Sequence, residues 1–213
     1  MEPRGSLAEY DRRQDRYIVR CTVQAPHRIR NILATQVFNL PENKIRVISE
    51  NMGGGFGMKG GCYPEYILTM VAAKLLDRPV KWISERSEGL ISDEQARDNV
   101  TDAELALDAD GKFLGLRVKM LAAGGAYYNS DRNSGPGTTN IGVLAGTYTT
   151  PAIHVESTGV VTNTMMTAHY RGAGRPEAAY VIETMVDLAA RQIGMDPAEL
   201  RRRNTIAPEQ MPF

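Results

Sequence analysis

The chain has 213 residues, of which 42% are hydrophobic and 23% are charged. Its 25 basic and 25 acidic side chains balance, so no net field favours nucleic acid or an anionic membrane as a partner. No apolar run approaches the roughly 20 residues that cross a bilayer, and residues 1–14 resemble neither a signal peptide nor a transit peptide. These features predict a cytoplasmic globular protein of one domain or two small ones.

The first half of the chain alternates between strand and helix patterns. Residues 1–15 are polar and are predicted to be an exposed lead-in. β-branched runs predict strands over 17–23, 44–49 and 80–83, and apolar spacing predicts helices after Pro26 and over 64–77. In the second helix Ile67, Met70, Val71 and Leu75 make one apolar face, and Ala72 and Ala73 allow close packing on a sheet. A strand, helix, strand order of this kind favours a parallel or mixed sheet.

The second half begins with a hairpin signal. Alternating runs over 101–107 and 113–122 flank the turn 108–111, and a further strand is predicted over 153–161. A long helix follows, with an apolar face of Ile182, Met185, Val186, Ala189 and Ile193, and Gly194 and Asp196 separate it from a last helix. The predicted class is α+β (mixed α/β), with mixed sheets and packed helices. Residues 16–213 are expected to form one domain, or two lobes made of 16–95 plus 165–213 and of 96–164.

Residues 52–61 hold six of the 20 glycines of the chain, between a predicted strand and a predicted helix. Glycine permits positive φ and lets backbone N–H groups approach an anionic or oxo ligand. A turn that is only structural is an equal alternative, because glycine motifs alone are weak signals. Residues 168–177 form a second glycine turn, which carries Arg171 and Arg175.

Neither turn has the spacing of a P-loop or of a dinucleotide-binding fingerprint, which disfavours nucleoside triphosphate and NAD sites. The three histidines show no metal-ligand spacing, and Cys21 and Cys62 form neither a zinc nor a disulfide pattern. A catalytic thiol at Cys62 is a minor alternative.

Three segments in this order, 24–27, 52–59 and 170–177, resemble the molybdopterin-binding large subunit of the xanthine dehydrogenase, aldehyde oxidase and carbon monoxide dehydrogenase superfamily. Further similar segments are 78–82, 108–112 and 196–201, so the resemblance covers almost the whole chain. The sequence is most similar to the carbon monoxide dehydrogenase large chain.

The resemblance implies a molybdenum cofactor held as a pterin dithiolene, expected in its cytosine dinucleotide form. In the family, a Gly-Phe-Gly backbone and a glutamine amide approach the metal centre, and an arginine-glycine turn lies against the pterin. Iron–sulfur and FAD groups on two partner subunits are implied as electron acceptors, and no residue of this chain is expected to ligate the metal. The residues that inherit cofactor-binding roles are Gln24, Gly54, Gly55, Phe56, Gly57, Arg171, Gly172, Ala173 and Gly174.

Departures from the family pattern bear on the substrate. Gly172 stands where copper-containing carbon monoxide dehydrogenases carry a cysteine, and Gly60 where xanthine-specific relatives carry a glutamate. Those relatives also have an arginine at Thr138–Thr139 and an aromatic residue at Ala173. The departures favour an aldehyde or a heterocycle as the small-molecule substrate, oxidised with water as the oxygen source. Carbon monoxide oxidation and a non-catalytic scaffold role are the alternatives.

The family's general base is a glutamate in a later glycine-rich segment, which this sequence does not contain. The chain is therefore expected to be a fragment that needs the remainder of the large subunit and is inactive alone. No catalytic residue is assigned within it.

Overall fold

The computed structural model describes all 213 residues, 1–213. The chain divides into two compact units, one made of Met1–Gln95 with Tyr128–Arg132 and the other of Ala96–Tyr127 with Asn133–Phe213. The C-terminal helices belong to the second unit, so the predicted lobe that joined 165–213 to 16–95 is wrong. None of the helices combines the length and apolar character needed to cross a membrane.

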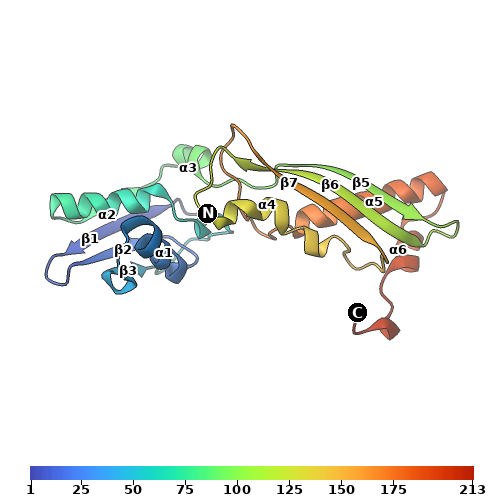
Figure 1. Cartoon of the computed structure of the whole chain (residues 1–213), viewed down its shortest axis with the longest axis horizontal. Helices are drawn as coiled ribbons and strands as arrows, with labels where there is room; N and C mark the ends of the chain where they lie inside the picture. Colours follow the sequence, from blue (N-terminus) through green and yellow to red (C-terminus); the bar gives the residue numbers. More distant parts are fainter. The chain divides into compact units, whose positions relative to one another are not determined.

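The first unit contains a four-stranded mixed sheet in the order β3-β2-β1-β4, of which Figure 1 labels β1, β2 and β3. β1 is antiparallel to both of its neighbours, whereas β2 and β3 are parallel and are joined through α1. β3 and β4 lie at opposite edges, so the strand, helix, strand unit around α2 does not place its strands side by side. The elements of this unit are β1 (Gly5–Asp11), β2 (Arg16–Cys21), α1 (Pro26–Ile32), a π-helical segment (Leu33–Phe38), short 3-10 turns (Glu42–Lys44 and Met58–Gly60), β3 (Ile45–Ile48), α2 (Pro64–Leu76), β4 (Val80–Ile83) and α3 (Arg86–Ser92).

β1 contradicts the predicted exposed lead-in. Ser6 and Ala8 of this strand are 2% and 0% exposed, and they face the core together with alternate residues of β2. The Ser6 and Thr69 hydroxyls lie 2.8 Å apart, so the buried serine has a hydrogen-bond partner on α2. The core of this unit is one cluster that joins the sheet to α1 and α2.

The buried face of α2 coincides only in part with the apolar face seen in the sequence. Tyr66, Thr69, Met70 and Ala73 are buried, while Leu75 is 78% exposed. Of the apolar face, Met70 is buried and Ile67 packs partly buried against the core, and Ala73 packs closely as expected. The buried face thus depends on aromatic and small residues that fit against the sheet rather than on the most apolar residues of the helix.

The second unit contains a three-stranded sheet in the order β5-β6-β7, with β5 antiparallel and β7 parallel to β6. The hairpin and the strand after it agree with the sequence prediction. α5 packs against this sheet through Ala178, Ile182 and Val186, in a core that includes Leu116 and Val118 of β6. The elements are β5 (Asn99–Leu107), β6 (Phe113–Gly125), α4 (Gly135–Thr138) with 3-10 turns on either side (Asp131–Ser134 and Ile141–Val143), β7 (Ile153–Val161), α5 (Arg175–Ile193), α6 (Pro197–Asn204) and a last 3-10 turn (Pro208–Gln210).

Candidate functional site

The first glycine turn connects β3 to α2 and has an unusual backbone. Phe56 has a φ of 52° and Gly57 a φ of 95°, both in the left-handed region. Such conformations cost free energy for a residue with a Cβ, and they persist where the surroundings hold them. The Phe56 ring is 41% exposed, so it does not secure the turn by packing in the core.

The side chain of Gln24 stabilises this turn by a hydrogen bond. It lies between β2 and α1, and its Oε1 accepts a hydrogen bond from the Gly57 N–H at 2.8 Å. A Cβ at Gly55 would lie 2.5 Å from the Gln24 side chain, so the glycine makes room for the amide. A backbone N–H only donates, so the amide oxygen must face Gly57. The Gln24 Nε2 donor is therefore directed away from the Gly57 N–H.

Lys59 is the cationic side chain of this turn, and it is fully buried. Its Nζ pairs with Glu2 Oε2 at 2.9 Å. Glu2 also binds the turn through its backbone, because Glu2 N–H donates to Gly53 O at 2.9 Å and Gly53 N–H donates to Glu2 Oε2 at 3.0 Å. Lys59 thus ties the N-terminal segment to the turn and does not point to a ligand.

Arg132 and Glu94 lie beside the same turn, and the sequence patterns gave no sign of either. Arg132 Nη2 donates to the Gly57 carbonyl at 2.6 Å and lies 3.3 Å from Glu94 Oε2. The side chains are 10% and 1% exposed. Burial raises the pKa of Glu94, while the Arg132 guanidinium acts in the opposite direction. Gly57 is therefore held through both of its flanking peptide groups, at its N–H by Gln24 and at its C=O by Arg132.

The second glycine turn lies immediately before α5. Gly172, Ala173 and Gly174 have φ values of 95°, 43° and 87°, three left-handed residues in a row. Ala173 N–H donates to Tyr170 O at 2.7 Å, which closes the turn. A Cβ at Gly174 would lie 2.5 Å from the backbone of Thr139 and Asn140, so this glycine allows close packing on the α4 segment.

Arg97 organises the second turn and was also absent from the sequence prediction. Its guanidinium donates a hydrogen bond to the Arg171 carbonyl. It also lies 3.7 Å from Glu177 and 5.3 Å from the centre of the Tyr170 ring. Because these partners lie on 170–177, only the three-dimensional fold reveals the role of a residue at position 97.

Cys62 does not fit the minor alternative of a catalytic thiol. It is 5% exposed, and burial raises its pKa to about 12. The thiol is protonated at neutral pH, whereas the reactive form of cysteine is the thiolate. Cys21 has the same burial and the same raised pKa.

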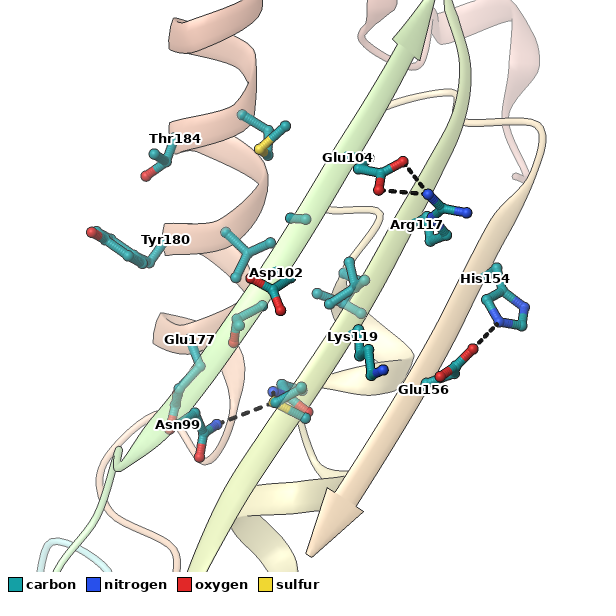
Figure 2. A pocket seen from close by; sticks show the side chains of 18 of the residues that line it. Asn99, Asp102, Glu104, Arg117, Lys119, His154, Glu156, Glu177, Tyr180 and Thr184 are labelled. Carbon is teal, nitrogen blue, oxygen red and sulfur yellow. Dashed lines mark hydrogen bonds and ion pairs between the residues drawn. The ribbon is translucent and has the colours of Figure 1, made fainter.

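A cavity of about 1130 Å³ lies in the second unit, with Tyr180 and Thr184 of α5 on one side and the β5 and β6 strands on the other (Figure 2). At one end Asn99 and Asn140 both donate an amide N–H to the Met120 sulfur, at 3.3 and 3.0 Å. Their Oδ1 atoms are buried without a hydrogen-bond partner. This end of the cavity therefore offers acceptors to a donor group or to water.

Among the predicted site residues, the structure brings Gln24, Gly55 and Gly57 together in the first unit. It also orders Arg171, Gly172, Ala173 and Gly174 as one turn in the second unit. The Cβ that Gly54 lacks would lie 2.7 Å from the Phe56 ring. The two turns belong to different units.

Known proteins resemble this chain over its whole length. The chain is 39% identical to the carbon monoxide dehydrogenase large chain of Hydrogenophaga pseudoflava, with 100% of this chain and 27% of that protein covered. It is 37% identical to the gamma subunit of the 6-hydroxypseudooxynicotine dehydrogenase complex of Paenarthrobacter nicotinovorans, with 100% and 26% covered. The chain thus spans about a quarter of the length of these relatives.

Solved structures agree with the sequence comparison. The crystal structure of quinoline 2-oxidoreductase from Pseudomonas putida 86 superimposes with a TM-score of 0.93 at 36% identity, over 100% of this chain and 27% of that one. The profile of the molybdopterin cofactor-binding domain matches residues 1–205. The match covers both units and both glycine turns, and on this basis the chain belongs to the molybdopterin cofactor-binding domain family.

Proposed function

We propose that this chain forms the first part of the molybdenum site in the large subunit of a molybdenum hydroxylase. The observation that carries the proposal is the contact between Gln24 and Gly57, at 2.8 Å. Because Oε1 accepts from Gly57, the Nε2 of Gln24 remains as a donor for another group. The glycines of the neighbouring turn place no side chains beside this donor. Donors with room around them fit a cofactor rich in oxo, pterin and phosphate acceptors. When bound, the cofactor supplies the redox centre that accepts two electrons from the substrate.

Roles follow for the two turns. In the first, the Gln24 amide and the backbone of Gly54, Gly55, Phe56 and Gly57 bind and orient the metal end of the cofactor. In the second, the backbone of Gly172, Ala173 and Gly174 and the guanidinium of Arg171 bind its pterin end. Left-handed backbone at both turns supports these roles, because glycine-rich turns of this kind allow a ligand to approach the backbone closely. The Gly54, Gly57 and Ala173 N–H groups already have partners within the chain, so the roles of these three residues rest on the conformation that they give the turns.

The substrate proposed for the complete enzyme is an aldehyde or a nitrogen heterocycle, hydroxylated with oxygen from water. A Cβ at Gly172 would lie 2.7 Å from the Pro176 ring at a φ of 95°, so the conformation disfavours a copper-binding cysteine there. Any side chain at Gly60 would collide with the Arg132 guanidinium, which disfavours a purine-binding glutamate. The similarity to 6-hydroxypseudooxynicotine dehydrogenase and to quinoline 2-oxidoreductase supports a heterocycle.

The remaining parts of the reaction are assigned outside this chain. We place the general base in the remainder of the large subunit, and the electron acceptors on an iron–sulfur subunit and an FAD subunit. The pterin is proposed to be the cytosine dinucleotide, and the complex to be cytoplasmic. The chain alone is expected to be inactive.

Analysis of the complete complex, purified from its source, tests the proposal. Molybdenum and pterin should be present at about one each per large subunit, with oxidation of aldehydes or quinoline-type heterocycles exceeding that of carbon monoxide. A complex without molybdenum and pterin would favour the scaffold role and refute the enzyme proposal. A loaded complex that oxidises carbon monoxide faster than the other substrates would refute the proposed substrate class.

A further inference from the structure

Both glycine turns have a backbone carbonyl bound by an arginine that is itself paired with a glutamate. In the first turn Arg132 binds Gly57 O at 2.6 Å and pairs with Glu94 at 3.3 Å. In the second turn Arg97 binds the Arg171 carbonyl and pairs with Glu177 at 3.7 Å. The arginines are 75 and 74 residues away in sequence from the carbonyls that they bind. The same arrangement thus occurs in each unit separately.

The first pair is built into the unit by two glycines. A Cβ at Gly60 would fall on the Arg132 guanidinium, and a Cβ at Gly61 would lie 2.5 Å from Glu94 Oε1. Neither glycine has a positive φ. Backbone freedom therefore does not require glycine at these two positions, whereas the space taken by the arginine and the glutamate does. Gly60 and Gly61 thus leave free the space that this ion pair occupies.

The arginine controls the direction of a peptide plane. C=O and N–H lie on opposite edges of a trans peptide, so fixing the Gly57 carbonyl also fixes the direction of the Met58 N–H. The Gly57 carbonyl accepts from the Gly60 N–H at 3.0 Å as well as from Arg132. By the same geometry, Arg97 fixes the direction of the Gly172 N–H through the Arg171 carbonyl.

The glutamates determine what the arginines contribute. A guanidinium presents a planar fork of donors, so it can bind a carbonyl and a carboxylate together. Pairing with buried Glu94 compensates the charge of Arg132 and holds its fork in one orientation, whereas the 3.7 Å ion pair of Arg97 with half-buried Glu177 compensates charge. Such a pair is suited to holding geometry rather than to adding positive charge at the turn.

We propose that Arg132 with Glu94, and Arg97 with Glu177, are positioning residues that set the two turns for the cofactor. Each arginine holds a turn carbonyl and so fixes the direction of the next backbone N–H, that of Met58 or Gly172, as a donor to the acceptor-rich cofactor. The inference rests on the proposed function, since it assigns the turns to the same cofactor. It adds four residues that touch the turns and not the substrate.

Substitutions in the complete complex test the first pair. Arg132→Lys keeps the charge but loses the fork, and Glu94→Gln keeps the shape but loses the compensating charge. Arg20→Lys is the matched control, because Arg20 forms an exposed pair with Glu9 in the same unit. The readouts are molybdenum and pterin content, kcat and KM per loaded molybdenum, the molybdenum paramagnetic resonance spectrum, and the melting temperature.

Misplacement of a positioned group by about 1 Å can cost up to a hundredfold in rate. We therefore expect kcat per loaded site to fall at least about tenfold in Arg132→Lys and in Glu94→Gln, with a changed resonance spectrum. Arg20→Lys should match the unmodified complex in every readout. A lower melting temperature or cofactor content, with unchanged kcat and spectrum per loaded site, would assign the pair a structural role and overturn the inference. Absence of molybdenum and pterin from the unmodified complex would instead overturn the proposed function together with it.

Discussion

Gly57 is held from both sides, because Gln24 binds its N–H and Arg132 binds its C=O. Its φ of 95° is open to glycine at little cost, whereas a β-branched residue there is strained. The residue therefore combines a conformational requirement with two hydrogen bonds that depend on that conformation. A side chain at this position should disturb the turn without affecting the core of the unit.

Replacing Gly57 by Val should destabilise the turn by about 1–3 kcal/mol. In the complete complex, molybdenum and pterin content should fall markedly. Gly142→Val is the control, since Gly142 lacks a positive φ and has open space where its Cβ would lie. Equal cofactor content in the two variants would show that the first turn is only structural.

Glu2 gives the same turn a dependence on pH. Its hydrogen bonds to the Lys59 ammonium and then to the Gly53 N–H hold its pKa below the ordinary value of 4.5. A carboxylate with a lowered folded pKa stabilises the folded state above its unfolded pKa, and this contribution is lost as pH falls through the folded pKa. Protection of the 53–61 amides from hydrogen exchange, corrected for intrinsic rates, should therefore decrease below about pH 4.5.

Glu2→Gln supplies the comparison for that measurement. This variant lacks the titrating group, so its protection should be lower at neutral pH and should show no further decrease around pH 4. A decrease of the same size in both proteins would assign the effect to another carboxylate.

At the scale of elements, β1 depends on Arg4, whose side chain is fully buried. Arg4 pairs with Glu65 of α2 at 2.8 Å and with Asp93 at 2.6 Å, and its guanidinium lies 3.8 Å from the centre of the Tyr63 ring. The strand is thereby connected to α2 and to the end of α3. These contacts explain how a polar segment lies at the centre of a sheet.

Arg4→Ala should lower the free energy of unfolding by about 3–5 kcal/mol, because Glu65 and Asp93 would remain without their partner. Arg20→Ala removes an exposed pair with Glu9 and should cost about 1 kcal/mol or less. Denaturant unfolding of the two variants measures the difference. Similar losses in both would mean that Arg4 contributes no more than a surface ion pair.

The sequence predicted most strands and helices but not β1, and the reason is physical. The buried positions of β1 are Ser6 and Ala8, which are small or polar, so the strand lacks an apolar alternation. The Ser6 contact to Thr69 and the Arg4 ion pairs stabilise it from a distance of more than 60 residues in sequence. Contacts of that range leave no local pattern.

The candidate site shows the same limit. Gln24, Gly57 and the second turn could be assigned because their local motifs resemble a family. Arg97, Glu94 and Arg132 could not, since each acts on a turn far away in sequence and none belongs to a glycine motif. Gly60 and Gly61, whose φ values do not require glycine, point to the ion pair only once the structure is known.

At the scale of the whole molecule, β7 is an edge strand that pairs only with β6. Eight of its nine residues are exposed, among them Val160 at 37% and Val161 at 71%. An apolar edge with unpaired backbone groups is a template for association with another strand. The face of the sheet that does not pack against α5 carries cross-strand charge pairs such as Glu104 with Arg117, visible in Figure 2. These charges disfavour the stacking of apolar surfaces on that face.

The isolated chain should therefore self-associate with increasing concentration, and Val161→Lys should reduce this association, because a charge on an edge strand disfavours strand pairing. Gln36→Lys adds the same charge at an exposed site of the first unit and is the control. Light scattering after size-exclusion chromatography measures the mass of each. A monomeric unmodified chain, or an equal effect of both substitutions, would contradict the role of β7.

The ion pair of Arg132 and Glu94 beside the first turn also constrains how this protein can evolve. Glutamate at position 60, the residue associated with purine recognition, would meet the Arg132 guanidinium where it now lies. Such a substitution requires either that the guanidinium moves away from the Gly57 carbonyl or that Arg132 is lost, which leaves buried Glu94 without this partner. The effect of a substitution at position 60 therefore depends on the residue at position 132, so the two positions are epistatic. A change at position 60 toward purine recognition thus also alters the support of the Gly57 carbonyl.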